Sequence, residues 1–177
     1  MLVGLLAPSC TFAQSTESGA RETAAALESV AALGLPATIE RVVDGDTIIV
    51  LVDGRTETVR LLGIDTPEKA GGPRPAECFG HEASAFATEL LPPGTNILLT
   101  RDNETRDQYG RLLAFVHRAD DGRFVNLSML ETGHATALFF APNTSLEEDF
   151  TSAANKARRD WLGFWPACGA ADLTIPS

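Results

Sequence analysis

The pattern that most restricts the fold is a hairpin signal in the first half of the chain. Two strand-like runs, 47–52 and 57–64, lie on either side of Asp53-Gly54. Asp-Gly is a favoured connection between antiparallel strands, because a tight hairpin turn needs residues that accept positive φ. A third strand-like run covers 38–43. We therefore expect three consecutive antiparallel strands.

The remainder of the chain alternates between helical and strand-like patterns. Apolar residues at helical spacing predict a helix over 80–91, which the Pro-Pro-Gly run at 92–94 ends. Ser145 and Glu148 form a capping box, which predicts that a last helix begins at 144 or 145. The other predicted segments are strands at 96–100 and 112–117, a short helix at 124–132, an extended run at 135–140, and the last helix continuing to about 162. Five strands with about three helices favour an α+β, mainly β fold built on a small closed barrel.

Length and charge limit the class of protein. A chain of 177 residues with 44% hydrophobic content can bury one good core but is short for two. Its apolar runs are strand-sized, so we expect a soluble protein with no membrane span. The net charge of -10 argues against a protein that packs DNA tightly, and most of the acids are interpreted as solvated surface. An enzyme with a metal ion and a few placed arginines can still bind phosphates locally.

The first residues resemble part of an export signal. Residues 1–7 are apolar, and a cleavage site could follow Thr-Phe-Ala at 11–13, but the positive segment that normally precedes the apolar run is missing. We expect a signal peptide over 1–13 whose true start lies upstream, with a tether at 14–36 that contains a weak helical stretch. The alternatives are that no export signal is present, or that Cys10 carries a lipid anchor. Export would make the protein secreted, either extracellular or periplasmic.

Removal of this leader would leave an even number of cysteines. Cys10 would be lost, and Cys78 and Cys168 would remain. Exported proteins tend to pair such cysteines, so we predict a disulfide that joins the C-terminal tail to the loop before the first long helix. Two buried, unpaired thiols are the alternative.

Three short segments contain residues that could bind a metal ion or take part in catalysis. They read Val-Asp-Gly-Asp-Thr at 43–47, Arg-Leu-Leu-Gly-Ile-Asp-Thr-Pro-Glu at 60–68, and Asp-Gln-Tyr-Gly-Arg at 107–111. Asp46 lies at a corner between two strands and Asp65 ends the third, so closure of a barrel could bring both to one mouth. Calcium takes clustered oxygen ligands of this kind. An Asp-Gly pair by itself, however, usually marks only a turn.

The same segments contain two notable arginines. Arg60 interrupts the apolar run 59–64, where a guanidinium needs an anionic partner or a place at the barrel rim. Arg111 stands at the start of another strand. Two guanidiniums can clamp phosphate oxygens. The alternative is that they form structural ion pairs with Asp65 or Asp107.

Together, and in this order, the three segments resemble the catalytic segments of the staphylococcal nuclease (thermonuclease) family. The resemblance covers roughly 37–165. It implies a five-stranded OB-fold barrel, with a nuclease domain at 37–168 and a tail at 169–177. It also implies a secreted, calcium-dependent nuclease that acts as an endonuclease and a monomer and hydrolyses DNA and RNA to products with 3′-phosphates.

The resemblance assigns roles to individual residues. Calcium would be bound by the carboxylates of Asp46 and Asp65 and by the carbonyl of Thr66, which Pro67 keeps out of helical hydrogen bonding. Glu68 would be the general base that activates the attacking water.

The arginines and four further positions also receive roles. Arg60 and Arg111 would stabilise the phosphoryl transition state. The family positions assigned to substrate contact or its support are Asp107, Tyr109, Leu138 and Phe140. The chain departs from the family's type member at the last two, where the type member carries tyrosines, and at Gln108, where it carries a lysine.

Two non-enzymatic functions compete with the nuclease. One is an inert nuclease-like barrel that binds nucleic acid or protein, and the other is an exported OB-type module for another oligomer such as a glycan. A relative without activity would be free to lose the base or an arginine. The presence of Glu68, Arg60 and Arg111 therefore favours the enzyme.

Overall fold

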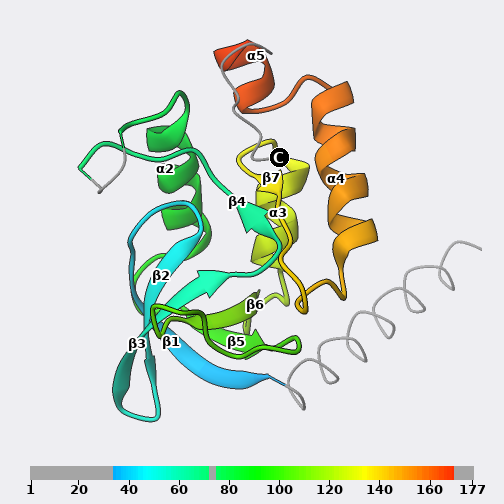
Figure 1. Ribbon diagram of the computed structural model, residues 1–177. Helices are drawn as coiled ribbons and strands as arrows, with labels where there is room; N and C mark the ends of the chain where they lie inside the picture. The colour runs from blue at the N-terminus through cyan, green and yellow to red at the C-terminus, as the bar shows by residue number, and fades with distance from the viewer. Residues whose placement is uncertain (1–33, 72–74, 170–177) are drawn as a thin grey trace, which may run out of the picture.

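A closed five-stranded barrel forms the centre of the computed structural model, which describes residues 34–71 and 75–169 (Figure 1). Its strands follow the order β1-β2-β3-β6-β5 around the barrel. Every neighbouring pair is antiparallel except β3 and β6, which are parallel. The barrel strands are β1 (Leu35–Val42), β2 (Thr47–Val52), β3 (Arg55–Leu61), β5 (Asn96–Thr100) and β6 (Leu112–Arg118). The predicted mainly β barrel is confirmed. The predicted leader and the helical stretch at 21–33 lie outside the described residues.

The predicted hairpin joins β2 to β3. Val52 pairs with Arg55, and both residues of the turn, Asp53 and Gly54, have positive φ angles of 48° and 77°. The first three strands are thus consecutive and antiparallel, as the sequence indicates.

The third strand is shorter than predicted. It ends at Leu61, and the chain turns at Gly63, whose φ is 74°. A Cβ atom at this glycine would collide with the rings of Phe139 and Phe150, so the turn packs directly under aromatic side chains. Beyond the turn, β4 (Ile64–Asp65) leaves the barrel and pairs with β7 (Thr136–Ala137). The predicted continuous strand 57–64 is therefore wrong, and most of the extended run 135–140 is not strand.

Four helices occur in the part of the chain that the structure describes. They are α2 (Gly80–Leu90), α3 (Val125–Glu131), α4 (Glu147–Arg159) and α5 (Phe164–Cys168). In Figure 1 they gather on one side of the barrel, and the β4–β7 pair lies among them. The short α5 was not predicted. None of these described helices is long and apolar enough to cross a membrane.

The last long helix begins later than its sequence pattern indicates. Its N-cap is Leu146, and no side chain caps it. The Ser145 backbone N–H donates instead to Asp102 Oδ2 at 3.0 Å, which takes this residue out of the predicted capping box. The helix ends at Arg159 rather than near 162, because Trp161 adopts a positive φ of 58°.

The core lies inside the barrel and continues under the helices. Phe150 of α4 is fully buried, and its ring contacts those of Phe115, Phe124 and Phe139 at centroid distances of 5.8, 5.5 and 5.9 Å. Burial of one such side chain stabilises the fold by roughly 1.5–3 kcal/mol. Other large, fully buried side chains are Ile39, Ile48, Val50, Leu61, Ile64, Leu91, Ile97, Leu99, Met129, Leu130 and Phe164.

The structure contains the disulfide that the cysteine count predicts. The Sγ atoms of Cys78 and Cys168 are bonded, and the two residues are 90 positions apart in the chain. The bond ties the last residue of α5 to the segment just before α2. It therefore fixes two parts of the helical layer to each other.

Candidate active site

The site begins at the corner between β1 and β2. Asp44 Oδ1 accepts a hydrogen bond of 3.2 Å from the Asp46 backbone N–H, which tightens the corner. A Cβ atom at Gly45 would collide with the side chain of Thr66, so this glycine lets a distant segment of chain approach closely. The corner thereby holds Asp46 against the segment that follows β4.

Asp46 is buried, with 7% of its surface exposed, and it connects several elements. Its Oδ2 accepts hydrogen bonds from the backbone N–H of Thr66 at 3.1 Å and from the Thr66 hydroxyl at 3.2 Å. Its Oδ1 accepts a bond of 3.0 Å from the Thr47 hydroxyl. Oδ2 also forms an ion pair of 3.2 Å with Arg60. A buried carboxylate needs such partners to remain charged.

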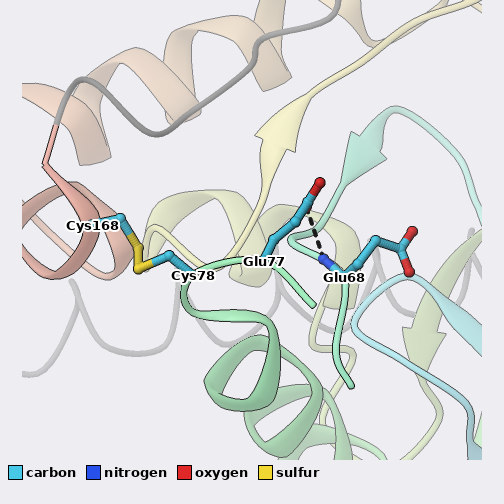
Figure 2. The surroundings of a disulfide bond; sticks show 4 residues. All are labelled: Glu68, Glu77, Cys78 and Cys168. Atoms are coloured by element: carbon cyan, nitrogen blue, oxygen red, sulfur yellow. Dashed lines mark hydrogen bonds between the residues drawn. A yellow bond between two sulfur atoms is a disulfide. The ribbon is translucent and has the colours of Figure 1, made fainter. Parts of the chain in front are cut away.

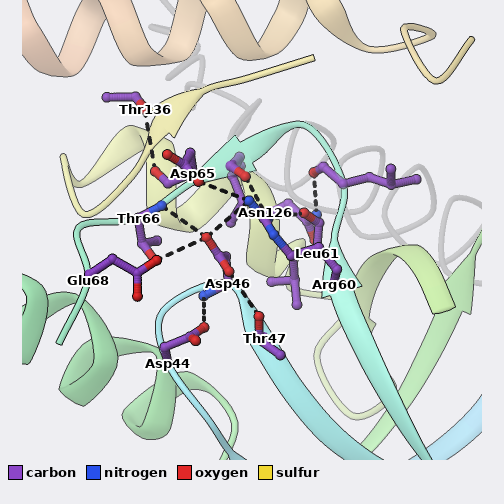
Figure 3. Close-up of polar contacts among 12 residues, drawn as sticks. Asp44, Asp46, Thr47, Arg60, Leu61, Asp65, Thr66, Glu68, Asn126 and Thr136 are labelled. Carbon is purple, nitrogen blue, oxygen red and sulfur yellow. Dashed lines mark hydrogen bonds and ion pairs between the residues drawn. The ribbon is translucent and has the colours of Figure 1, made fainter. Parts of the chain in front are cut away.

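Arg60 lies between the two predicted calcium-binding acids (Figure 3). Its Nη2 atom is 3.2 Å from Asp46 Oδ2 and 3.0 Å from Asp65 Oδ1. Its Nη1 atom donates to the carbonyl oxygens of Leu61 and Ile64, both at 2.7 Å. The turn at the end of β3 presents these carbonyls. The guanidinium is thus held by both ends of the turn that leads to Asp65.

Glu68 lies in the same cluster because the two residues before it are buried there. Thr66 is buried against Asp46, and Pro67 is buried next to it. Glu68 follows directly and is half-buried, and Figure 3 shows its side chain beside Thr66. The structure therefore brings Asp46, Arg60, Asp65, Thr66 and Glu68 together.

Arg111 is held by a different turn. Its Nε atom lies 2.6 Å from Asp107 Oδ2, while Asp107 Oδ1 accepts the backbone N–H groups of Tyr109 and Arg111 at 2.9 and 3.0 Å. Burial opposes ionisation of Asp107, but these hydrogen bonds and the charge of Arg111 outweigh it and lower the pKa of Asp107 below its usual value. Tyr109 is 75% exposed, and its ring centroid lies 5.5 Å from Arg111 Cζ.

Strand register relates this turn to the acid cluster. Arg60 on β3 pairs with Leu113 on the parallel strand β6. Arg111 comes two residues before Leu113, and side chains two apart along an extended chain point to the same face. Arg111 itself lies just before β6, which begins at Leu112, so it is close in the chain to the strand that pairs with β3.

Leu138 and Phe140 follow β7, the strand that pairs with β4. The Leu138 backbone N–H donates to the Gly63 carbonyl at 3.1 Å, so this segment runs beside the turn that leads to Asp65. Leu138 is half-buried, whereas Phe140 is 71% exposed. Neither side chain can donate a hydrogen bond to a phosphate.

Two polar residues near the cluster were missed by sequence analysis. Burial, together with the charge of Asp46, raises the pKa of Asp44 to about 6. Asn126 is buried in α3, where its Nδ2 donates to the Leu62 carbonyl at 2.8 Å and its Oδ1 accepts from the Val116 N–H at 2.9 Å. Asn126 thereby satisfies backbone groups at the turn after β3. The Asp-Gly-Asp pattern could have indicated Asp44, but no sequence signal indicates Asn126.

Comparison with known proteins agrees with this geometry. The family model for staphylococcal nuclease homologues matches residues 58–167. The chain belongs to the staphylococcal nuclease family. The family expected from the three motifs is thus confirmed, and the barrel is the OB-fold that this membership implies.

Individual relatives are similar over most of this nuclease domain. A thermonuclease of Staphylococcus intermedius is 37% identical over 127 residues, which cover 72% of this chain and 74% of the relative. Endonuclease YncB of Bacillus subtilis is 38% identical over 136 residues, or 75% of this chain and 62% of the relative. The prophage-derived endonuclease YokF of the same species is also 38% identical over 136 residues, but this chain covers only 44% of its length.

The donor atoms in the acid cluster of this family member suit a hard cation. Within 34–71 and 75–169, no group of three or more His, Cys, Asp or Glu side chains is arranged to hold a metal ion. The cluster instead offers two carboxylates, those of Asp46 and Asp65, which converge on the single positive charge of Arg60. If the Thr66 carbonyl joins them, as the family resemblance implies, the set would be all oxygen, and calcium commonly completes such a set with water or substrate oxygens. The residues present therefore fit calcium.

Proposed function

We propose that this chain, a nuclease of the staphylococcal nuclease family, hydrolyses the phosphodiester bonds of DNA and RNA in the presence of calcium, at the cluster around Arg60. The observation that carries the proposal is the convergence of Asp46 and Asp65 on the Arg60 Nη2 atom, at 3.2 and 3.0 Å. Cationic charge at this position, with Glu68 close by in the chain, matches the needs of an anionic phosphorane-like transition state.

In the proposed reaction Glu68 accepts a proton from the attacking water. The oxygen of that water forms a bond to phosphorus, and the bond between phosphorus and the 5′ oxygen breaks, with a proton passing to the leaving oxygen. The products are a 3′-phosphate and a 5′-hydroxyl. Asp46, Asp65 and the Thr66 carbonyl would hold calcium, which would supply positive charge to polarise a phosphoryl oxygen.

The two arginines hold the phosphoryl group. Arg60 is oriented in advance by the Leu61 and Ile64 carbonyls, and Arg111 by Asp107, so little conformational freedom is lost when substrate binds. Asp107 acts by orienting Arg111, and the exposed ring of Tyr109 lies beside the same guanidinium. Because these contacts are made to phosphate, the enzyme accepts both DNA and RNA. Leu138 and Phe140 line the same substrate path through apolar contact.

The proposal includes export of the protein. Residues 1–13 are a signal peptide, 14–36 a tether, 37–168 the nuclease domain and 169–177 a tail. The disulfide between Cys78 and Cys168 supports an extracellular or periplasmic location, because such bonds persist in oxidising compartments. The enzyme acts as a monomer and as an endonuclease.

The test is cleavage of single-stranded DNA and RNA by the purified full chain, in calcium and then in chelator. Glu68→Gln is assayed beside wild type, with Glu89→Ala, an exposed glutamate of α2, as the control for loss of one negative charge. The proposal expects cleavage that requires both calcium and Glu68, with 3′-phosphate ends. A folded wild-type protein that binds but never cuts would leave the inert binding module as the function.

A further inference from the structure

The backbone of Glu68 is held by Glu77, nine positions later in the chain (Figure 2). The Glu68 backbone N–H donates to the Glu77 carboxylate, at 2.9 Å from Oε2. In return, the Glu77 backbone N–H donates to the Glu68 carbonyl at 2.8 Å. Both polar groups of the Glu68 backbone are therefore bound by one residue.

The first turn of α2 packs against the same backbone. The Gly80 N–H donates to the Glu77 carbonyl at 3.2 Å, so the residue that holds Glu68 is also joined to the start of the helix. Gly80 is buried, and a Cβ atom there would collide with the carbonyl oxygen of Glu68. Helix and loop thus approach as closely as a glycine permits.

The disulfide is attached to the residue that follows Glu77. Cys78 binds Cys168 at the end of α5, and Phe164 at the start of the same short helix is fully buried. The Phe164 N–H donates to the Gly133 carbonyl at 3.0 Å, which anchors α5 to the end of α3. The covalent bond therefore connects Glu77 to a rigid part of the molecule.

We propose that Glu77 is a positioning residue for Glu68 and that the disulfide between Cys78 and Cys168 keeps Glu77 in place, so that the rate of hydrolysis depends on this bond. The inference rests on the proposed role of Glu68 as general base. The bonds between Glu77 and Glu68 are made to the Glu68 backbone, so in this proposal Glu77 acts by positioning the base. Its loss would leave the base on a looser backbone, and a displacement of about 1 Å can lower a rate by up to about 100-fold.

The first test compares Glu77→Ala and Glu77→Gln with Glu89→Ala. We expect Glu77→Ala to lower kcat between about 10-fold and about 100-fold with little change in KM, because the substrate contacts remain. Glu77→Gln keeps an oxygen that can accept from the Glu68 N–H and should recover most of kcat. Glu89→Ala removes the same charge from an exposed helical position and should match wild type. Equal kcat values for Glu77→Ala and Glu89→Ala would overturn the inference.

The second test removes the disulfide with the double variant Cys78→Ser/Cys168→Ser, assayed well below its melting temperature. We expect kcat to fall in the same direction as in Glu77→Ala. Because the bond acts through Glu77, adding Glu77→Ala to the double variant should cost much less than it costs in wild type. Full additivity of the two losses would overturn the link between the disulfide and Glu77.

A third measurement needs no activity. Amide hydrogen exchange at Glu68 should be slow in wild type and Glu77→Gln and faster in Glu77→Ala, while exchange in the barrel strands is unchanged. If the Glu68 amide exchanges equally in all three, Glu77 does not hold it. Failure of the proposed function has a different signature, namely a wild type that does not cleave or a Glu68→Gln variant that cleaves normally.

Discussion

The Arg60 Nη2 atom lies 3.0 Å from Oδ1 of Asp65. The two residues are five positions apart, and the turn between them brings their side chains together. The same nitrogen pairs with Asp46 at 3.2 Å, so two acids of the cluster share one guanidinium. A cation that binds these acids must share them with Arg60 or release it. The charge balance of the site therefore couples metal binding to the arginine proposed to hold the phosphate.

Replacement of Arg60 should damage both stability and activity. In chelator, Arg60→Ala leaves two partly buried carboxylates without their cation and should lower the free energy of unfolding by about 3 kcal/mol. The loss of a charged donor at the transition state should lower kcat by about 10²- to 10³-fold. Arg60→Lys should recover part of the stability but little of kcat, because an ammonium cannot reproduce the planar fork that contacts two carbonyls and two carboxylates. Denaturant unfolding and steady-state kinetics measure these effects, and a kcat for Arg60→Ala within about two-fold of wild type would contradict the role.

Calcium should protect the fold against heat through Asp46 and Asp65. At a calcium concentration 100 times its Kd, the stabilisation is about 2.7 kcal/mol, which raises the melting temperature. Asp46→Asn and Asp65→Asn should each remove most of this calcium-dependent increase while the protein remains folded. Thermal scans with calcium and with chelator make the measurement. Equal protection of wild type and both variants would place the cation elsewhere.

Gly45→Ala should disrupt the contact between the strand corner and Thr66. The new methyl group would collide with the Thr66 side chain, so we expect a loss of about 1–3 kcal/mol in stability together with a loss of activity. Gly54→Ala is the matched control: its position at the tip of the hairpin has positive φ and open space around it. That variant should lose about 1 kcal/mol of stability and keep its kcat. Similar kcat values for the two variants would show that the close approach at Gly45 does not matter for catalysis.

Two histidines, each stacked on a phenylalanine, should make the fold less stable in mild acid. Burial lowers the pKa of His117, which stacks on Phe124 at 4.3 Å, and of His134, which stacks on Phe86 at 4.2 Å. The unfolded chain therefore binds more protons than the folded protein just below the ordinary histidine pKa of 6.5. Stability should be retained above that value and fall as the pH drops through it toward the folded-state pKa values. The variant His117→Gln/His134→Gln should show a shallower fall in melting temperature between about pH 7 and pH 5 than wild type. Parallel curves would mean that other groups cause the acid sensitivity.

Features that depend on residues close together in the chain could be predicted from the sequence. The Asp53-Gly54 hairpin, the helix near residues 80–90 and the barrel strands all follow from local turn chemistry and hydrophobic periodicity. The family, the mainly β fold and the nuclease class are confirmed by the comparisons. The individual roles of the site residues stay predictions.

The sequence-based predictions were wrong where contacts from distant parts of the chain override the local preference for a strand or a helix cap. The pattern of 57–64 looks like one strand, but Phe139 and Phe150 pack on Gly63 and divide it. Ser145 has the sequence of a helix cap, yet its backbone bonds to Asp102 instead. A contact with a side chain from a distant part of the chain can offset a local preference for helix or for a helix cap, which is worth about a few tenths to one kcal/mol.

The sequence by itself determined which chemical groups this nuclease carries and which turns and strands they border, because both are properties of neighbouring residues. Only the tertiary structure decided how those groups meet. The pairing of β2 with β3 and the turn after β3 bring Asp46, Arg60 and Asp65 together, and the disulfide-linked segment before α2 brings Glu77 to Glu68. These contacts depend on how strands, turns and helices pack on one another, so they form only when the whole core packs and the barrel closes.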